Sequence, residues 1–190
     1  MRIKICGITN LGDARIAERE GASAIGVVMF SLSPRSVTPD RARAIFDSVG
    51  PFTATVAVSH TRSEEELGQI LALHPTAIQV SHRFTFRDDL DVRVIRVIRL
   101  GDQVPDDCDA IIIDESHGGG KQCDLSHARD LVQRSNVPVI LAGGLNAGNV
   151  KEAISRVRPY AVDVASGVEV RPGVKDPAKI RAFVKACREE

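Results

Sequence analysis

The sequence is poor in aromatic side chains, which make up 4% of its 190 residues, with one Tyr and no Trp. Proteins that stack nucleic-acid bases, or that lie at a membrane interface, depend on such side chains. Net charge is missing too, because 25 Lys and Arg balance 25 Asp and Glu. A neutral chain has no overall field that attracts nucleic acid or an anionic membrane. We therefore expect neither as a partner.

Long apolar runs and paired cysteines are also absent. No run of about 18 apolar residues is available for a membrane span, and Met1 leads directly into Arg-Ile-Lys-Ile-Cys without the apolar core of a signal peptide. The four cysteines are Cys6, Cys108, Cys123 and Cys187, and none forms a CxxC pair. We expect reduced thiols and a cytoplasmic location.

What the sequence does contain is typical of a compact globular chain. Hydrophobic residues make up 43% and charged residues 26%, close to the average of folded proteins. Domains usually hold about 100 to 200 residues. We therefore expect residues 1–190 to form a single domain with an aliphatic core.

Short runs rich in Val and Ile recur along the chain. The eight candidate strands are residues 2–8, 24–29, 53–59, 77–81, 93–100, 110–114, 138–142 and 161–165. Several runs are apolar throughout, such as Ile111-Ile112-Ile113, as expected for strands of a parallel sheet that is covered on both faces. Helices must then lie between the strands.

Helix signals occur in most of the gaps. Asn10 can cap a helix that ends at Gly21, and Thr38 with Pro39 opens one that ends at Gly50. The other predicted starts are Ser63 in a capping box, Asp124 or Ser126, Asn146, and Asp176 with Pro177. The gaps 81–93 and 100–110 differ, because a full crossover takes about ten to twelve residues at the least. We expect stunted or missing helices after the fourth and fifth strands.

Alternating strands and helices fit either an open doubly wound sheet or a closed barrel. The first turn reads Cys6-Gly7-Ile8-Thr9-Asn10, without the GxGxxG of a dinucleotide site, and His117 to Gln122 does not match a phosphate loop. Polar and glycine residues instead follow several strands, as at the mouth of a barrel. They are Cys6, Arg35, Asp114, Gly143-Gly144 and Ser166-Gly167. An α/β fold with a (βα)8 TIM barrel is therefore preferred.

Five motifs together identify a family. They are Lys4-Ile5-Cys6-Gly7-Ile8-Thr9, Ser33-Pro34-Arg35, Ile113-Asp114 followed by Gly118-Gly119-Gly120-Lys121, Ala142-Gly143-Gly144-Leu145-Asn146, and Asp163-Val164-Ala165-Ser166-Gly167-Val168-Glu169 with Pro172-Gly173. Over nearly its whole length the chain resembles phosphoribosylanthranilate isomerases, which are (βα)8 barrels of tryptophan biosynthesis. One departure is Ser81, where the family usually has a histidine at the end of the fourth strand.

The resemblance implies an isomerase that performs an Amadori rearrangement on a phosphorylated aminosugar, without a cofactor and without a metal. It implies that Cys6 is the base and Asp114 the acid. It also implies that Arg35 binds the anthranilate carboxylate and that Gly143, Gly144, Ser166 and Gly167 bind phosphate. We expect a monomer or a homodimer.

The residues themselves allow both functional and structural interpretations. A thiol with a pKa near 8.5 is mostly neutral at pH 7, so Cys6 as a base needs a nearby cation or helix terminus, and Lys4 lies on the same strand face. Alternatively Cys6 is a small core residue, Asp114 caps a loop and Arg35 is solvated. The glycines can serve turns with positive φ as well as phosphate contact.

Two other functions compete with the isomerase. His60, His82, Asp114 and His117 all follow strands and can be read as ligands of a metal-dependent sugar-phosphate epimerase, although their spacing is not tight. The other is a phosphosugar-binding barrel without catalysis, which is expected to lose the acid or the base, and both are present.

The region between the fourth and sixth strands carries one more expectation. Strand alternation places Arg96 and Arg99 on opposite faces, so at least one points outward or toward the mouth. With little helix above it, the outer face of this strand is expected to expose Val or Ile. Either Phe84 and Phe86 fold over it, or a second subunit covers it.

Overall fold

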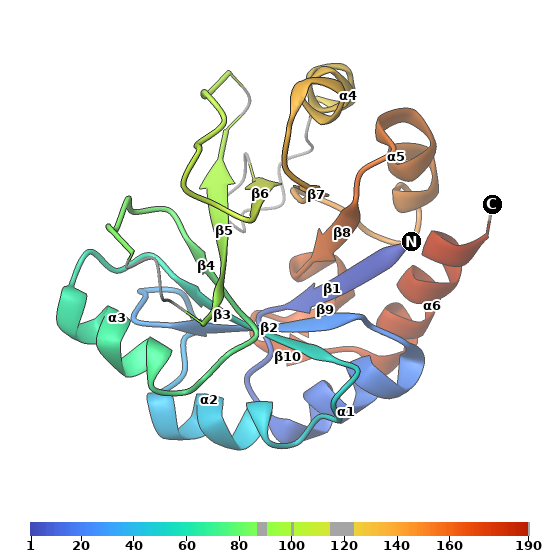
Figure 1. Cartoon of the computed structure of the whole chain (residues 1–190). Helices are drawn as coiled ribbons and strands as arrows, with labels where there is room; N and C mark the ends of the chain where they lie inside the picture. The colour runs from blue at the N-terminus through green and yellow to red at the C-terminus, as the bar shows by residue number, and fades with distance from the viewer. Residues whose placement is uncertain (87–90, 100, 115–123, 190) are drawn as a thin grey trace.

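In a computed structural model that describes residues 1–86, 91–99, 101–114 and 124–189, eight parallel strands close into a barrel (Figure 1). The strands are β1 (Arg2–Cys6), β2 (Ala24–Met29), β3 (Ala54–Ser59), β4 (Ala77–Val80), β5 (Arg93–Ile98), β6 (Ala110–Ile113), β7 (Val139–Leu141) and β8 (Ala161–Val164). Strand β1 pairs with both β2 and β8, which closes the ring. The predicted (βα)8 barrel is confirmed, and the strands lie within the predicted runs.

Alternation along each strand separates two cores. In β5, Ile95 belongs to the cluster inside the barrel, whereas Val94 and Ile98 belong to the larger cluster between the strands and the outer layer. Because both faces are buried, the strands can be apolar throughout, as the sequence predicted.

Six helices of the described residues lie outside the barrel. They are α1 (Leu11–Glu20), α2 (Pro39–Phe46), α3 (Glu64–Leu71), α4 (Leu125–Arg134), α5 (Val150–Val157) and α6 (Pro177–Arg188). None of the helices in the described part of the chain is long and apolar enough to span a membrane.

Most predicted helix caps are confirmed. The side chains of Asn10, Thr38, Ser63, Asp124 and Asp176 each accept a hydrogen bond from an amide of the first helical turn. Two predicted boundaries are wrong. The residue before α5 is Asn149, because Asn146 uses its side chain in a turn with the Gly148 amide. Helix α2 ends at Phe46, before Gly50.

The wall at β5 lacks helices, as predicted. Among the described residues there is no helix between β4 and β5 or between β5 and β6, and loops take that place in Figure 1. The predicted exposure of Val and Ile on the outer face is wrong, however. Val94 and Ile98 are buried, because Phe84, Phe86, Val104 and other loop residues pack against them. Phe84 and Phe86 thus form the local cover.

Arg96 holds that cover in place. It points outward from β5, yet it is only 2% exposed. Its guanidinium donates to the carbonyl oxygens of His82 and, at 3.1 Å, Phe84, and it pairs with Asp107 at 2.5 Å. It also lies 5.2 Å from the centre of the Phe86 ring. One buried arginine thereby joins the loops on both sides of β5.

A small hairpin after β8 was not predicted. A short 3₁₀ helix, η1 (Ser166–Val168), leads into the antiparallel strands β9 (Glu169–Arg171) and β10 (Val174–Lys175). Gly173 turns between them with φ +79°, and its carbonyl oxygen accepts a hydrogen bond from Thr9 Oγ1 at 2.6 Å. The hairpin is therefore tied to the loop that follows β1.

Candidate active site

A cavity of about 490 Å³ lies at the carboxyl ends of the strands, where barrel enzymes place their chemistry. Cys6, Arg35 and Asp114 all line it, together with His60, Gln79 and residues of the loop after β2. The structure therefore brings together the predicted base, acid and carboxylate-binding residue, although they come from distant parts of the chain.

Cys6 is the last residue of β1 and faces the barrel interior, with 8% of its surface exposed. Its neighbour across the strand pair is Gly26 of β2. A Cβ on Gly26 would lie 2.8 Å from Cys6 Sγ and 3.1 Å from Lys4 Cε. Gly26 thus makes the room in which the thiol and the Lys4 side chain lie side by side.

Beneath Cys6, Lys4 is held by two polar side chains of the barrel interior. Its Nζ donates to Asp163 Oδ1 of β8 and to Gln79 Oε1 of β4, both at 2.9 Å. All three residues are buried. A buried ammonium group needs such partners, since the loss of its hydration would otherwise be very costly. The sequence pointed to Lys4 but not to the roles of Gln79 and of Asp163, which was quoted only as part of a motif. Their signal is a polar residue at an inward position of an apolar strand.

Burial raises the pKa of the Cys6 thiol, and Lys4 opposes that increase by favouring the thiolate. Asp163 adds to the increase, whereas Lys175 acts in the same direction as Lys4. For Lys4 itself, burial lowers the pKa, but Asp163 and Cys6 outweigh burial, so its pKa is raised and it stays charged. The thiol therefore has a permanent cation next to it.

Asp114 follows β6 directly and is half-buried. In the closed ring, β6 is separated from β1 by β7 and β8. Asp114 and Cys6 therefore face the cavity from opposite parts of the mouth. This placement allows a proton to be donated on one side of a bound molecule and removed on another.

Arg35 is paired with Glu169, a residue that the sequence analysis quoted only as part of a motif. Its Nε and Nη2 donate to the two carboxylate oxygens of Glu169 at 2.9 and 2.7 Å. Glu169 Oε1 also accepts from Lys175 Nζ at 3.0 Å. The pKa of the Glu169 carboxyl is lowered, because these two cations outweigh the effect of burial. The Pro172-Gly173 turn signals the hairpin that carries Glu169, but it does not indicate that Arg35 is the partner.

Gly7 allows the Arg35 side chain to pass close to Cys6, the predicted base. The backbone of Gly7 has φ +75°, which favours glycine, and a Cβ there would lie 2.6 Å from Arg35 Cδ. The arginine stem therefore crosses directly over the residue that follows Cys6.

The four residues predicted to bind phosphate lie beside this cavity and do not line it. Gly143 and Gly144 follow β7, with φ values of +93° and +65°, and Ser166 and Gly167 follow β8. A Cβ on Gly167 would lie 2.0 Å from the Leu145 carbonyl oxygen, so the two loops are in contact. Ala165, next to Ser166, does line the cavity. The backbone here can approach a ligand closely.

The described residues do not include a set of side chains that could bind the metal of the epimerase alternative. In the described ranges, no three His, Cys, Asp or Glu side chains converge as metal ligands do, and His117 lies outside those ranges. His60 lines the cavity, and its Nδ1 lies 3.4 Å from Ser81 Oγ. His82 instead packs against the Phe84 ring, with the ring centres 4.7 Å apart.

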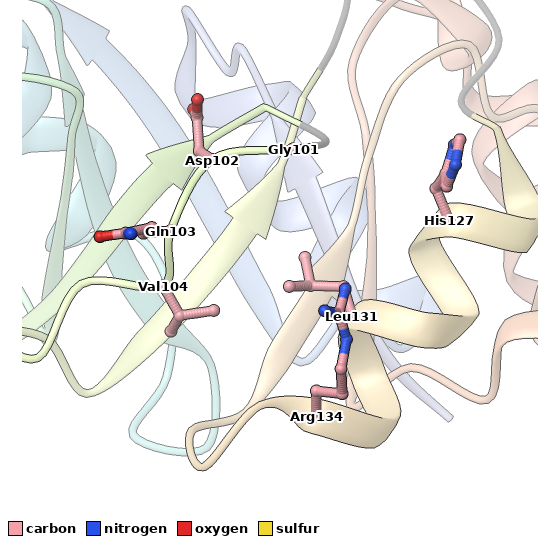
Figure 2. Close-up of a pocket in the computed structure, with 7 residues that line it drawn as sticks. All are labelled: Gly101, Asp102, Gln103, Val104, His127, Leu131 and Arg134. Atoms are coloured by element: carbon pink, nitrogen blue, oxygen red, sulfur yellow. The ribbon is translucent and has the colours of Figure 1, made fainter.

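A second hollow, of about 600 Å³, lies away from the mouth. Figure 2 shows the loop residues Gly101 to Val104 on one side and His127, Leu131 and Arg134 of α4 on the other. It occupies the gap left where no helix follows β5, and its polar side chains are exposed. It contains neither Cys6 nor Asp114, so we assign the chemistry to the mouth.

Comparison with known proteins gives a consistent picture. The family model for N-(5'-phosphoribosyl)anthranilate (PRA) isomerase matches residues 3–186. The N-(5'-phosphoribosyl)anthranilate isomerase of Methanoregula boonei is 57% identical over 190 residues, covering 100% of this chain and 97% of its own.

Solved structures agree. The phosphoribosyl anthranilate isomerase of Thermus thermophilus has a TM-score of 0.86 and 35% identity over 98% of each chain. An isomerase in complex with reduced 1-(o-carboxyphenylamino)-1-deoxyribulose 5-phosphate has a TM-score of 0.81 and 32% identity, covering 99% of this chain and 98% of that one.

Proposed function

Because the chain belongs to the N-(5'-phosphoribosyl)anthranilate isomerase family and is an isomerase of tryptophan biosynthesis, we propose that Cys6 and Asp114 carry its proton transfers. The reaction is an Amadori rearrangement of N-(5-phosphoribosyl)anthranilate, which turns an aminoaldose into the corresponding 1-amino-1-deoxyketose. No atom is gained or lost, so the protein has only to move protons.

Asp114 donates a proton to the ring oxygen of the ribose, and the ring opens to a Schiff base at C1. Cys6, as a thiolate, removes the proton from C2, which leaves an enolamine. This tautomerises to the ketone product. Positioned acids and bases contribute about 10² to 10⁴ each to the rate.

The observation that carries this proposal is the common cavity. Cys6 and Asp114 line the same space from opposite parts of the mouth, and Lys4 stands beside the thiol. A thiol alone is mostly protonated at neutral pH, so a neighbouring cation is what makes the base plausible. A purely structural cysteine needs no such neighbour.

Arg35 is proposed to bind the anthranilate carboxylate, while the loops with Gly143, Gly144, Ser166 and Gly167 hold the phosphate. The solved relative at 32% identity contains a reduced product that carries both a carboxyphenyl group and a phosphate. In this chain, a cation on the loop after β2 and glycine-containing loops after β7 and β8 suit the two ends of such a ligand.

The assembly is proposed to be a monomer or a homodimer. Among solved relatives at 30% identity is a structure of monomers derived from the dimeric isomerase of Thermotoga maritima. Light scattering of the purified protein at several concentrations decides between the two states.

The activity is tested by mixing the protein with freshly made phosphoribosyl anthranilate and following the loss of its fluorescence. We expect enzyme-dependent loss that persists in the presence of a metal chelator. Loss no faster than the uncatalysed reaction, with a folded protein, would contradict the proposal. Activity that the chelator abolishes would favour the metal-dependent alternative.

A further inference from the structure

Among the described residues, Glu169 is the hydrogen-bond partner of the Arg35 guanidinium, and it occupies one side of that group. The two hydrogen bonds use Nε and Nη2, and each goes to a different carboxylate oxygen. This side-on pairing leaves the end of the guanidinium, formed by Nη1 and the second Nη2 proton, for another acceptor. Arg35 also lines the cavity with Cys6 and Asp114. A second carboxylate can therefore bind Arg35 without displacing the first.

Glu169 is itself firmly held. Besides Arg35, its Oε1 accepts from Lys175 Nζ at 3.0 Å and from the Gly173 amide at 3.2 Å. Its side chain is 4% exposed. The backbone is fixed as well, because Lys179 Nζ donates to the Glu169 carbonyl oxygen at 2.7 Å. Because the Glu169 carboxylate is buried, water cannot take the place of Arg35 as its partner.

The charges around Glu169 favour an incoming anion. The carboxylate lies between the cations of Arg35 and Lys175, so this trio carries one net positive charge. Lys175 has a side chain of 0% exposure and is already bound to Glu169 and to the Ala165 carbonyl oxygen. Arg35 is the member of the trio that faces the cavity.

We propose that Glu169 is a positioning residue that fixes Arg35 along its Nε and Nη2 side and directs the Nη1 end toward the substrate carboxylate. Glu169 thereby sets the preference for a carboxylated aromatic amine. The substrate adds to the Arg35–Glu169 pair and does not replace Glu169. This inference rests on the proposed role of Arg35, and it assigns Glu169 no proton transfer.

The first test compares two ligands on the variant Glu169→Gln, which keeps the shape of the side chain and removes its charge. The ligands are the reduced carboxylated product and the same compound without the carboxylate. We expect binding of the first to weaken about tenfold and binding of the second to change less than about twofold. The turnover number should fall less than the affinity. Tighter binding of the carboxylated ligand would overturn the proposal, because Glu169 would then be a competitor.

A double-mutant cycle shows whether Glu169 acts through Arg35. In the Arg35→Ala background, Glu169→Gln should no longer change the ratio of the two affinities. An equal change in both backgrounds would overturn the inference. If Arg35→Ala itself leaves the ratio unchanged, the proposed role of Arg35 fails instead. If Arg35→Ala alters the ratio and Glu169→Gln does not, only the inference about Glu169 fails.

The matched control is Glu20→Gln, which removes a carboxylate that accepts hydrogen bonds from Nε and Nη2 of Arg181, the same two groups that Arg35 uses, but outside the cavity. It should leave the affinity ratio unchanged, and a change as large as that of Glu169→Gln would overturn the inference. If Glu169→Gln alone does not fold, the double variant Glu169→Gln with Lys175→Met removes both charges of the buried pair. The same loss of carboxylate preference is expected from it, and an unchanged preference contradicts the proposal.

Discussion

Buried charge serves different purposes on the two sides of this barrel. On the side of β1, β2 and β8, the cations Lys4, Arg35 and Lys175 face the interior or the mouth, paired with Asp163 and Glu169. On the side of β4 to β6, the buried cation is Arg96, which faces outward and holds loops. We call these the reactive side and the wall side.

The difference between them lies in the balance of charge. In the ion pairs of the reactive side, the three cations Lys4, Arg35 and Lys175 share two carboxylates, which leaves one positive charge in these pairs near a thiol and a cavity. On the wall side, Arg96 is matched by Asp107 and by backbone carbonyl oxygens. The excess lies beside the cavity in which we propose that an anionic substrate binds, whereas Arg96 holds loops over a strand that no described helix covers.

The largest effect is expected from Cys6 on the reactive side and from Asp114, which follows β6 and lines the same cavity. Cys6→Ala and Asp114→Asn should each lower the turnover number by about 10² to 10⁴, with a much smaller change in substrate affinity. The physical reason is that each change removes one proton transfer and leaves the binding contacts in place. The rate of fluorescence loss, measured at several substrate concentrations, gives both the turnover number and the apparent substrate affinity. Near-normal turnover in either variant would remove that residue from the mechanism.

A smaller effect is expected on the wall side, and on stability instead of turnover. Arg96→Met should lower the free energy of unfolding by about 2 to 3 kcal/mol, because hydrogen bonds to a charged group typically contribute about 1.5 to 3 kcal/mol. Urea titration measures the loss. The turnover number should stay within about twofold of the native value, since Arg96 does not line the catalytic cavity.

Arg93→Met is the control for that prediction. Arg93 lies on the same strand and pairs with Asp109 at 2.7 Å, but its side chain is 77% exposed. Exposed pairs contribute about 0 to 1 kcal/mol. Equal losses of stability in the two variants would mean that burial of Arg96 adds nothing, and the contrast between the two sides would disappear.

Much of the catalytic cavity could be predicted from the sequence. The strands were visible because parallel strands buried on both faces are continuously apolar, and the positions just after them gave Cys6, Arg35 and Asp114. What could not be predicted was the pairing. Glu169 is 134 positions from Arg35, and Asp163 is 159 from Lys4, so only the closed ring and the hairpin bring them together.

On the wall side, the missing helices could be predicted from the sequence, but the packing of the loops could not. Chain length correctly predicted that helices are missing, because it sets what can fit between strands. It could not predict that Val94 and Ile98 are buried, since their cover depends on how Arg96 gathers two loops. Strand alternation predicts that Arg96 or Arg99 points outward or toward the mouth, but the burial of Arg96 depends on the tertiary structure.

A shift of the pH profile of activity is expected from the cation beside the thiol. Burial raises the pKa of Cys6, and Lys4 limits the increase. Lys4→Met should therefore raise the Cys6 pKa further, so the rise of kcat/KM with pH moves to higher pH. Below the pKa, the thiolate fraction falls about tenfold per pH unit, and activity at neutral pH falls with it.

Two measurements check this shift. One is the pH profile of kcat/KM, and the other is the pH dependence of Cys6 alkylation by iodoacetamide, followed by mass spectrometry. Lys4→Arg retains the charge and should keep both profiles near the native ones. Lys151→Met, which changes an exposed lysine of α5, should leave them unchanged. If Lys4→Met lowers activity but moves neither profile, Lys4 is structural only.

The smallest effect is expected without any mutation, in the local stability of the wall. Loops held by few buried contacts open at lower free energy than packed helices. Amides of residues 82–86 and 101–109 should therefore exchange before those of α3 and α6. The amides of Phe84 and Asp109 report this best, because each donates to a carbonyl oxygen, of His82 and Val94 respectively. We expect them to exchange about tenfold faster than interior amides of α6, which corresponds to 1.4 kcal/mol. Uniformly strong protection across both loops in a proven monomer would show that Arg96 makes the wall as rigid as the helices do on the reactive side.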